Sequence, residues 1–140
     1  MTKFDRNYRI WKMVPLVVMA LFLALPGTGM CGTAIKDGAV FKGGATDKKG
    51  SRFASSFRVT SLNEATGEFT GEISWPSLNS VHKIEGAIRG NTVVFKETGH
   101  IKRGGAHLNC EYAFVFDGQT LTGRWIEPRV DHGPAEFTLQ

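Results

Sequence analysis

Residues 67–96 contain the strongest folding signal in the chain. Apolar side chains alternate there with polar ones, first at Phe69, Ile73 and Trp75 and then, after Pro76, at Ile84 and Ile88. An alternation with a period of two places one set of side chains on a core face and the other in water. Gly90-Asn91 favours a tight hairpin turn before the β-branched and aromatic run at 92–95. The stretch therefore predicts three consecutive antiparallel strands.

The rest of the chain repeats this pattern in shorter pieces. Further strands are predicted at residues 38–42, 53–62, 108–116, 120–127 and 135–139. Polar or glycine-rich segments predict connections at residues 43–50, 63–67, 97–105 and 128–134. Asp117-Gly118 is typical of a type I′ hairpin turn. No convincing helix is predicted after the first 30 residues.

Eight short strands in sequential order predict an all-β domain, and a closed barrel is the favoured architecture. A meander of eight strands can close into an antiparallel up-and-down barrel, which removes exposed sheet edges. Gly71, Gly86 and Gly123 lie within strands on the inward parity, where sharply coiled strands need them. We expect an eight-stranded meander barrel as the single domain of residues 31–140. A two-sheet sandwich is the second choice.

The first 30 residues differ in character from the rest. A basic segment, residues 1–12, precedes the apolar run Val14–Leu25, and small residues follow at 26–29. This order is typical of a secretory signal peptide, and the run is short for a membrane-spanning helix, which needs about 20 residues. We therefore expect residues 1–30 to be a signal peptide of a secreted or periplasmic protein. An uncleaved anchor is the alternative.

The two cysteines, Cys31 and Cys110, fit one disulfide in an exported protein. Closing so long a loop would stabilise the fold by a few kcal/mol, about 2–4 in typical cases. Lipid modification of Cys31 is an alternative, although Met30 occupies the position where lipoprotein signals usually carry a small residue. In the simplest alternative, Cys110 is a small buried apolar side chain.

The net charge of +4 does not indicate a nucleic-acid partner, because most of it lies in the N-terminal segment. From Gly32 onward the chain has 13 basic and 12 acidic residues, which leaves +1. Phosphate binding needs clustered Lys and Arg. Contact with a membrane is expected only through the N-terminal segment, if that segment is uncleaved or lipidated.

Three short phrases resemble the strand pattern of avidin-like barrels: Phe69-Thr-Gly-Glu-Ile73, Ile84-Glu-Gly-Ala-Ile88 and Leu121-Thr-Gly-Arg-Trp125. More loosely, they are similar to those of the wider calycin superfamily, which includes lipocalins. The resemblance covers about residues 39–139 and implies an eight-stranded barrel with a ligand mouth at one end. The polar residues with which avidins bind biotin have no residue-by-residue counterparts here, so the resemblance does not imply biotin as the ligand.

Trp75, Tyr112 and Trp125 are the predicted ligand-binding residues. All three have inward parity, and Tyr and Trp combine an apolar body with one hydrogen-bonding group. The alternative is that they fill the barrel, since the interior of a small eight-stranded barrel is just wide enough for side chains. The other residues predicted to point inward are Phe41, Phe57, Phe69, Ile73, Ile84, Ile88, Val93, Phe95, Leu108, Phe114, Leu121, Phe137 and Leu139.

No catalytic motif, cofactor site or metal site is predicted. Ser55, Ser56 and Ser61 lack a nucleophile motif. The four histidines, at 82, 100, 107 and 132, match no ligand spacing and are expected on the surface. We therefore expect a non-enzymatic exported barrel that binds a small apolar ligand or a protein surface. The alternative is an inhibitor or interaction protein with a filled barrel, which presents residues 43–50 and 99–105 to a protein partner.

Overall fold

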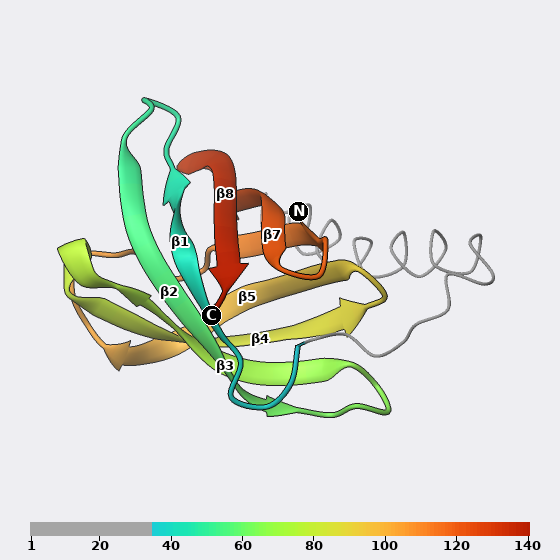
Figure 1. Ribbon diagram of the computed structural model, residues 1–140. Coiled ribbons are helices and arrows are strands. Elements are labelled where there is room, and N and C mark those ends of the chain that lie inside the picture. The colour runs from blue at the N-terminus through green and yellow to red at the C-terminus, as the bar shows by residue number, and fades with distance from the viewer. Residues whose placement is uncertain (1–34) are drawn as a thin grey trace, which may run out of the picture. The chain divides into compact units, whose positions relative to one another are not determined.

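The computed structural model describes residues 35–140, which form a closed antiparallel barrel (Figure 1). Each strand pairs with the next along the chain, and β1 pairs with β8 to close the barrel. The up-and-down barrel predicted from the sequence is therefore confirmed. Its elements are β1 (Val40–Thr46), β2 (Arg52–Leu62), β3 (Glu68–Trp75), the 3-10 helix η1 (Pro76–Leu78), β4 (Ser80–Arg89), β5 (Thr92–Lys102), β6 (Glu111–Phe116), β7 (Thr120–Glu127) and β8 (Asp131–Leu139).

Several strands have different bounds from those predicted. β1 continues through the glycines of the predicted 43–50 loop, because Gly43 must pair with both β2 and β8. A Cβ atom on Gly43 would lie 1.9 Å from the carbonyl oxygen of Glu136, so the strands approach more closely there than a side chain allows. Gly71, Gly86 and Gly123 show the same close approach to a neighbouring strand.

The other differences lie at one end of the barrel. β5 extends to Lys102 through most of the segment predicted as a loop, and β8 begins at Asp131 rather than at Ala135. β6 begins only at Glu111, because Asn109 has a left-handed φ of 82° that interrupts the strand. Leu108 therefore precedes the strand and is only half-buried.

The β6–β7 turn is also different from the prediction. A type I′ turn needs positive φ at both central residues. Here Gly118 has a φ of 103°, whereas neither Asp117 nor Gln119 has a positive φ. The Oδ1 atom of Asp117 instead accepts hydrogen bonds from the backbone N–H groups of Gln119 and Thr120, which lowers the pKa of this carboxyl group.

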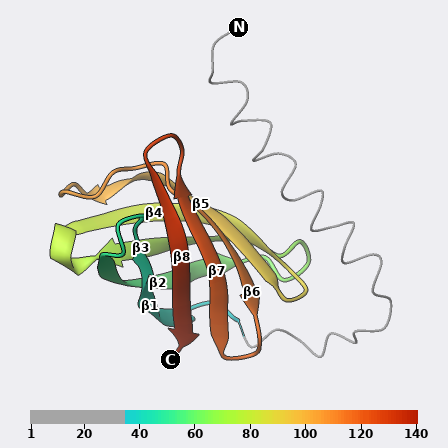
Figure 2. The ribbon, with the colours of Figure 1, turned by 90° about the horizontal axis from the view of Figure 1, so that it is seen from above.

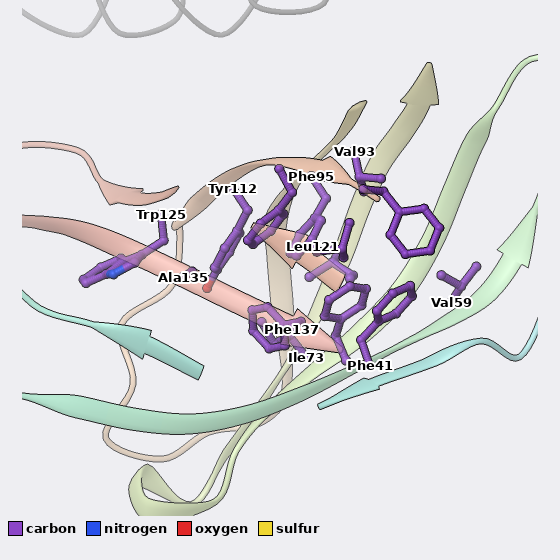
Figure 3. Close-up of a cluster of buried hydrophobic side chains, with 14 of the residues drawn as sticks. Phe41, Val59, Ile73, Val93, Phe95, Tyr112, Leu121, Trp125, Ala135 and Phe137 are labelled. Atoms are coloured by element: carbon purple, nitrogen blue, oxygen red, sulfur yellow. The ribbon is translucent and has the colours of Figure 1, made fainter. Parts of the chain in front are cut away.

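The barrel interior is packed with aromatic side chains (Figure 3). Phe41 stacks on Phe57 with ring centroids 4.7 Å apart, and Phe95 stacks on Tyr112 at 4.5 Å. Phe137 meets Phe57 edge to face at 5.1 Å. Of the predicted inward set, all except Leu108 and Leu139 are buried, and these two are partly buried. The alternation therefore identified the core faces correctly.

The two ends of the barrel differ. At one end Ile35 is buried against the core, and the N–H group of Gly38 donates to the carbonyl of Val59, so the segment before β1 lies across that end. The other end carries Trp125, which lies at the opposite side of the aromatic cluster from Val59 in Figure 3. Strands β6, β7 and β8 run side by side between the two ends (Figure 2).

The predicted signal peptide at residues 1–30 and the predicted disulfide partner Cys31 lie outside the described residues. Within residues 35–140 no helix has the length and apolar character needed to cross a membrane.

Candidate functional site

A pocket of about 190 Å³ opens at the end of the barrel where β1, β3 and β7 finish. Its walls come from these strand ends, from η1, from the start of β8 and from the β5–β6 connection. The lining residues are Ala45, Asp47, Phe53, Trp75, Leu78, Gly105, Ala106, His107, Cys110, Trp125, Glu127 and Asp131. An apolar, aromatic lining with a few polar groups is typical of small-molecule sites.

Two of the three predicted binding residues, Trp75 and Trp125, line this pocket. Trp75 ends β3 and Trp125 lies near the end of β7, so barrel closure brings together residues that are far apart in sequence. The indole N–H of Trp125 donates to the carbonyl of Thr46 at 2.9 Å, and that of Trp75 donates to Oε1 of Glu97 at 3.3 Å. Both N–H groups are therefore held by the protein, and both rings are 90% or more buried.

Tyr112, the third predicted residue, lies deeper and does not line the pocket. Its ring is 1% exposed and stacks on Phe95. Its hydroxyl donates to Oε1 of Glu97 at 2.8 Å. The structure therefore places Tyr112 in the layer below the mouth, where it supports the side chains that form the pocket wall.

Glu97 is the centre of a buried polar cluster in that layer. It is 3% exposed, and its Oε1 atom accepts hydrogen bonds from both Tyr112 and Trp75. Its Oε2 atom lies 2.9 Å from Nδ1 of His82, which is fully buried. These two atoms are close enough for an ion-pair contact but are not aligned as a hydrogen bond. A carboxylate in this setting depends on its partners, because an unpaired buried charge is very costly.

His82 and His100 extend the cluster across the β4–β5 pair. Their strands place them opposite each other, and the two rings meet edge to face at 4.9 Å. Desolvation by the surrounding protein lowers the pKa of His100, and electrostatic interactions with Arg103 and His82 lower it further. Nδ1 and Nε2 of His82 and Nδ1 of His100 are buried without a hydrogen-bond partner among the described residues.

The prediction that the histidines are on the surface is wrong for His82, which is fully buried, and His100 is half-buried. Sequence reasoning also assigned Glu97 to a loop. One signal was present for each: His82 continues the inward parity of Ile84, and Glu97 continues that of Val93 and Phe95. A charged or imidazole side chain at an inward-facing position usually marks the point where a strand ends. The pattern therefore did not predict that these two side chains are buried.

Cys110 lines the pocket as a buried thiol and has no disulfide partner among residues 35–140. Burial raises the pKa of this thiol strongly, and the negative charges of Glu97 and Glu127 raise it further. Because the thiolate is the reactive form, the group is not activated as a nucleophile. Its predicted partner Cys31 lies outside the described residues, so the disulfide stays a prediction.

Three carboxylates and one histidine form the polar part of the lining. Nδ1 of His107 lies 2.7 Å from Oε1 of Glu127. Oδ1 of Asp47 accepts from the backbone N–H groups at positions 49 and 51. Oδ1 of Asp131 accepts from the backbone N–H of Lys48 at 2.9 Å, and this hydrogen bond lowers the pKa of Asp131.

A larger hollow, of about 380 Å³, lies beside the β7–β8 turn. Its lining includes Lys48, Arg124, Arg129 and His132, which are exposed side chains, and it contains no aromatic ring other than that of His132. Long, exposed, charged side chains do not form a rigid surface that could select a ligand by its shape. The smaller pocket is the better candidate because buried indoles form its wall.

Residues 35–140 contain no group of three or more His, Cys, Asp or Glu side chains that could hold a metal ion.

No protein-family model and no curated protein matches this sequence. Among solved structures, the chain is similar to apo shwanavidin, with 17% identity and a TM-score of 0.47 over 78% of this chain and 100% of that one. This likeness concerns the course of the barrel strands and says nothing about a ligand.

Proposed function

We propose that this protein binds a small ligand in the pocket between Trp75 and Trp125. The observation that carries the proposal is that two buried indoles from separate strands line one concave site at the barrel mouth. Both rings are held by hydrogen bonds to the protein, so they form a wall of fixed geometry. A fixed wall reduces the ordering cost of binding.

The size of the pocket limits the ligand. A volume of about 190 Å³ is below the usual range of drug-sized sites, but a cavity of roughly 150 Å³ is enough for benzene. Below the pocket the barrel is filled by Tyr112, Phe95 and Phe137, each at most 1% exposed. The ligand is therefore no larger than one ring with a short substituent, and it stays at the mouth.

We infer that the site binds its ligand without transforming it. The one thiol in the lining, Cys110, has a raised pKa, and the carboxylates hold turn backbone or His107.

We further propose that residues 1–30 direct export to the periplasm or the outside of the cell. The basic, apolar and small-residue order of this segment supports the proposal. The denatured mass of protein expressed with its full leader would fix the cleavage point and would reveal a lipid on Cys31 or the two-hydrogen deficit of a disulfide. An intact leader would contradict cleavage.

Native mass spectrometry of the same sample tests ligand binding. We expect an extra mass that disappears on denaturation and is lost in the W75F and W125F variants. V115T is the control, because Val115 is an exposed apolar residue on β6 outside the pocket. If wild-type protein shows no extra mass and binds no ring-sized probe, the pocket proposal fails, and a filled barrel acting through its loops takes its place.

The alternative function, binding of a protein partner through residues 43–50 and 99–105, would use segments that are held in place by hydrogen bonds. Residues 43–46 belong to β1, and Lys48 is anchored because its Nζ donates to the carbonyl of Val130 at 2.8 Å. The β5–β6 connection is also anchored, since the N–H of Gly105 donates to Leu78 and that of Ala106 donates to Ser80. A protein partner would therefore meet a fixed surface rather than free loops.

A further inference from the structure

The pocket has few free hydrogen-bond donors. The indole N–H groups of Trp75 and Trp125 are used within the protein, as described above. The backbone N–H groups of Asp47, Gly105 and Ala106 donate to Ser51, Leu78 and Ser80 respectively. A ligand that presents only acceptors, such as a carboxylate, would therefore lose its water without gaining donors in return.

The same pocket is rich in acceptors. Asp47, Glu127 and Asp131 line it, and the lining contains neither Lys nor Arg. The hydrogen bonds and the ion pair described above engage Oδ1 of Asp47, Oε1 of Glu127 and Oδ1 of Asp131. In these contacts the second oxygen of each carboxylate takes no part.

Positive side chains lie on the outer side of these acids, not in the pocket. Lys48, Arg124 and Arg129 line the larger hollow, which shares Glu127 and Asp131 with this pocket, and Lys48 interacts electrostatically with Asp131. None of the three lines the pocket itself. The His107 imidazole contacts one of the three acids, Glu127, and its side chain is 69% exposed. Even a protonated His107 would leave the formal charge of the lining negative.

The aromatic groups favour the same kind of ligand. Phe53, Trp75 and Trp125 line the pocket, and with their N–H groups engaged elsewhere the two indoles offer only ring surface. The face of an aromatic ring attracts a cation, most strongly for Trp, and such rings are the usual partners of ammonium groups. Ring surface and carboxylates together select an organic cation over a neutral or anionic molecule.

We propose that the ligand of this pocket is an organic cation, an ammonium group on an apolar body of about one ring. The inference rests on the proposed binding function and names the chemical class of its ligand. The described carboxylates are not arranged as a metal site, so an ion without an apolar body does not fit the wall of rings. The ammonium group is expected beside Asp131 and Glu127, with the apolar body between the indoles.

Three benzyl-type probes of similar size test this proposal: benzylammonium, benzyl alcohol and benzoate. Their dissociation constants would be measured at pH 7 by the change in tryptophan fluorescence and by calorimetry, at low and high salt. We expect benzylammonium to bind at least about tenfold more tightly than benzyl alcohol, and benzoate to bind most weakly. High salt should reduce the advantage of the cation, because the acids are partly exposed.

Charge variants separate this effect from general electrostatics. D131N keeps an oxygen to accept the Lys48 N–H bond but removes the charge, and E127Q removes a second charge. E136Q is the matched control, because Glu136 is an exposed β8 residue outside the pocket and its loss changes the net charge equally. We expect a severalfold loss of benzylammonium affinity in D131N and E127Q that exceeds any change in their benzyl alcohol affinity, and little change with either probe in E136Q.

The outcomes are distinguishable. If benzyl alcohol binds as well as benzylammonium, or benzoate binds best, the cation proposal is overturned while the binding site stands. If D131N and E127Q bind benzylammonium as tightly as E136Q does, Asp131 and Glu127 do not bind the ammonium group, and the proposal is also overturned. If no probe binds to wild-type protein, both the cation proposal and the proposed function are rejected.

Discussion

The hydroxyl of Tyr112 lies 2.8 Å from Oε1 of Glu97, inside the barrel on the adjacent strands β6 and β5. The same oxygen accepts the indole N–H of Trp75, which forms part of the pocket wall. One buried carboxylate thus links the filled interior to the open mouth. The stability of the barrel and the geometry of its pocket therefore depend on the same residue.

Replacing Glu97 should test this link directly. E97A would leave the Tyr112 hydroxyl and the Trp75 N–H without an acceptor, and each buried unsatisfied group costs about 1–3 kcal/mol. We expect a loss of about 2–5 kcal/mol in the free energy of unfolding measured with urea. E97Q keeps an oxygen acceptor and should lose less. E85Q, at an exposed β4 position, is the control; equal stability of E97A and E85Q would contradict the role given to Glu97.

The alkaline stability of the protein should depend on Tyr112. Burial raises the pKa of Tyr112 well above its usual value, and the nearby Glu97 raises it further. The folded state therefore holds this proton more tightly than the unfolded state, so the contribution is complete below about pH 10 and is lost as the pH rises above it. We expect the unfolding free energy to fall more in wild type than in Y112F as the pH rises above about 10.

The thiol of Cys110 should be inert in the folded protein. Burial raises its pKa, and the side chain is only 7% exposed. In a C31S background, so that one cysteine remains, we expect no reaction with a thiol reagent at pH 8 and rapid reaction after unfolding in urea. Fast modification of native C31S protein would show that the mouth opens around Cys110.

Gly133 should be intolerant of substitution, because it lies against both β1 and Trp125. A Cβ atom there would lie 1.8 Å from the carbonyl oxygen of Thr46 and 3.2 Å from the indole nitrogen of Trp125. G133A should therefore destabilise the barrel by about 1–3 kcal/mol and shift the tryptophan emission to longer wavelength. G99A is the control, since its Cβ would meet nothing closer than a Lys83 side-chain carbon at 3.8 Å. Normal stability of G133A would contradict the tight closure.

Local patterns in the sequence predict the strands, their order and their inward faces. Alternation at Phe69–Trp75 and in later strands requires only that one face be buried, and local turns allow only neighbours to pair. It also selected Trp75 and Trp125 as inward residues. These features are local, so a reading of adjacent residues can find them.

Local patterns do not show which inward residues contact each other, because these contacts depend on how the whole barrel closes. Parity gives the face of a strand but not the depth of a residue along the barrel. That depth depends on the register of every strand pair and on the bulges in β5 opposite β4. Closure of β1 on β8 places Trp125 beside Thr46 at the mouth, and the β5–β6 register buries Tyr112 with Glu97. A polar residue such as Glu97 is stable inside only because these distant partners reach it, and no local pattern contains them.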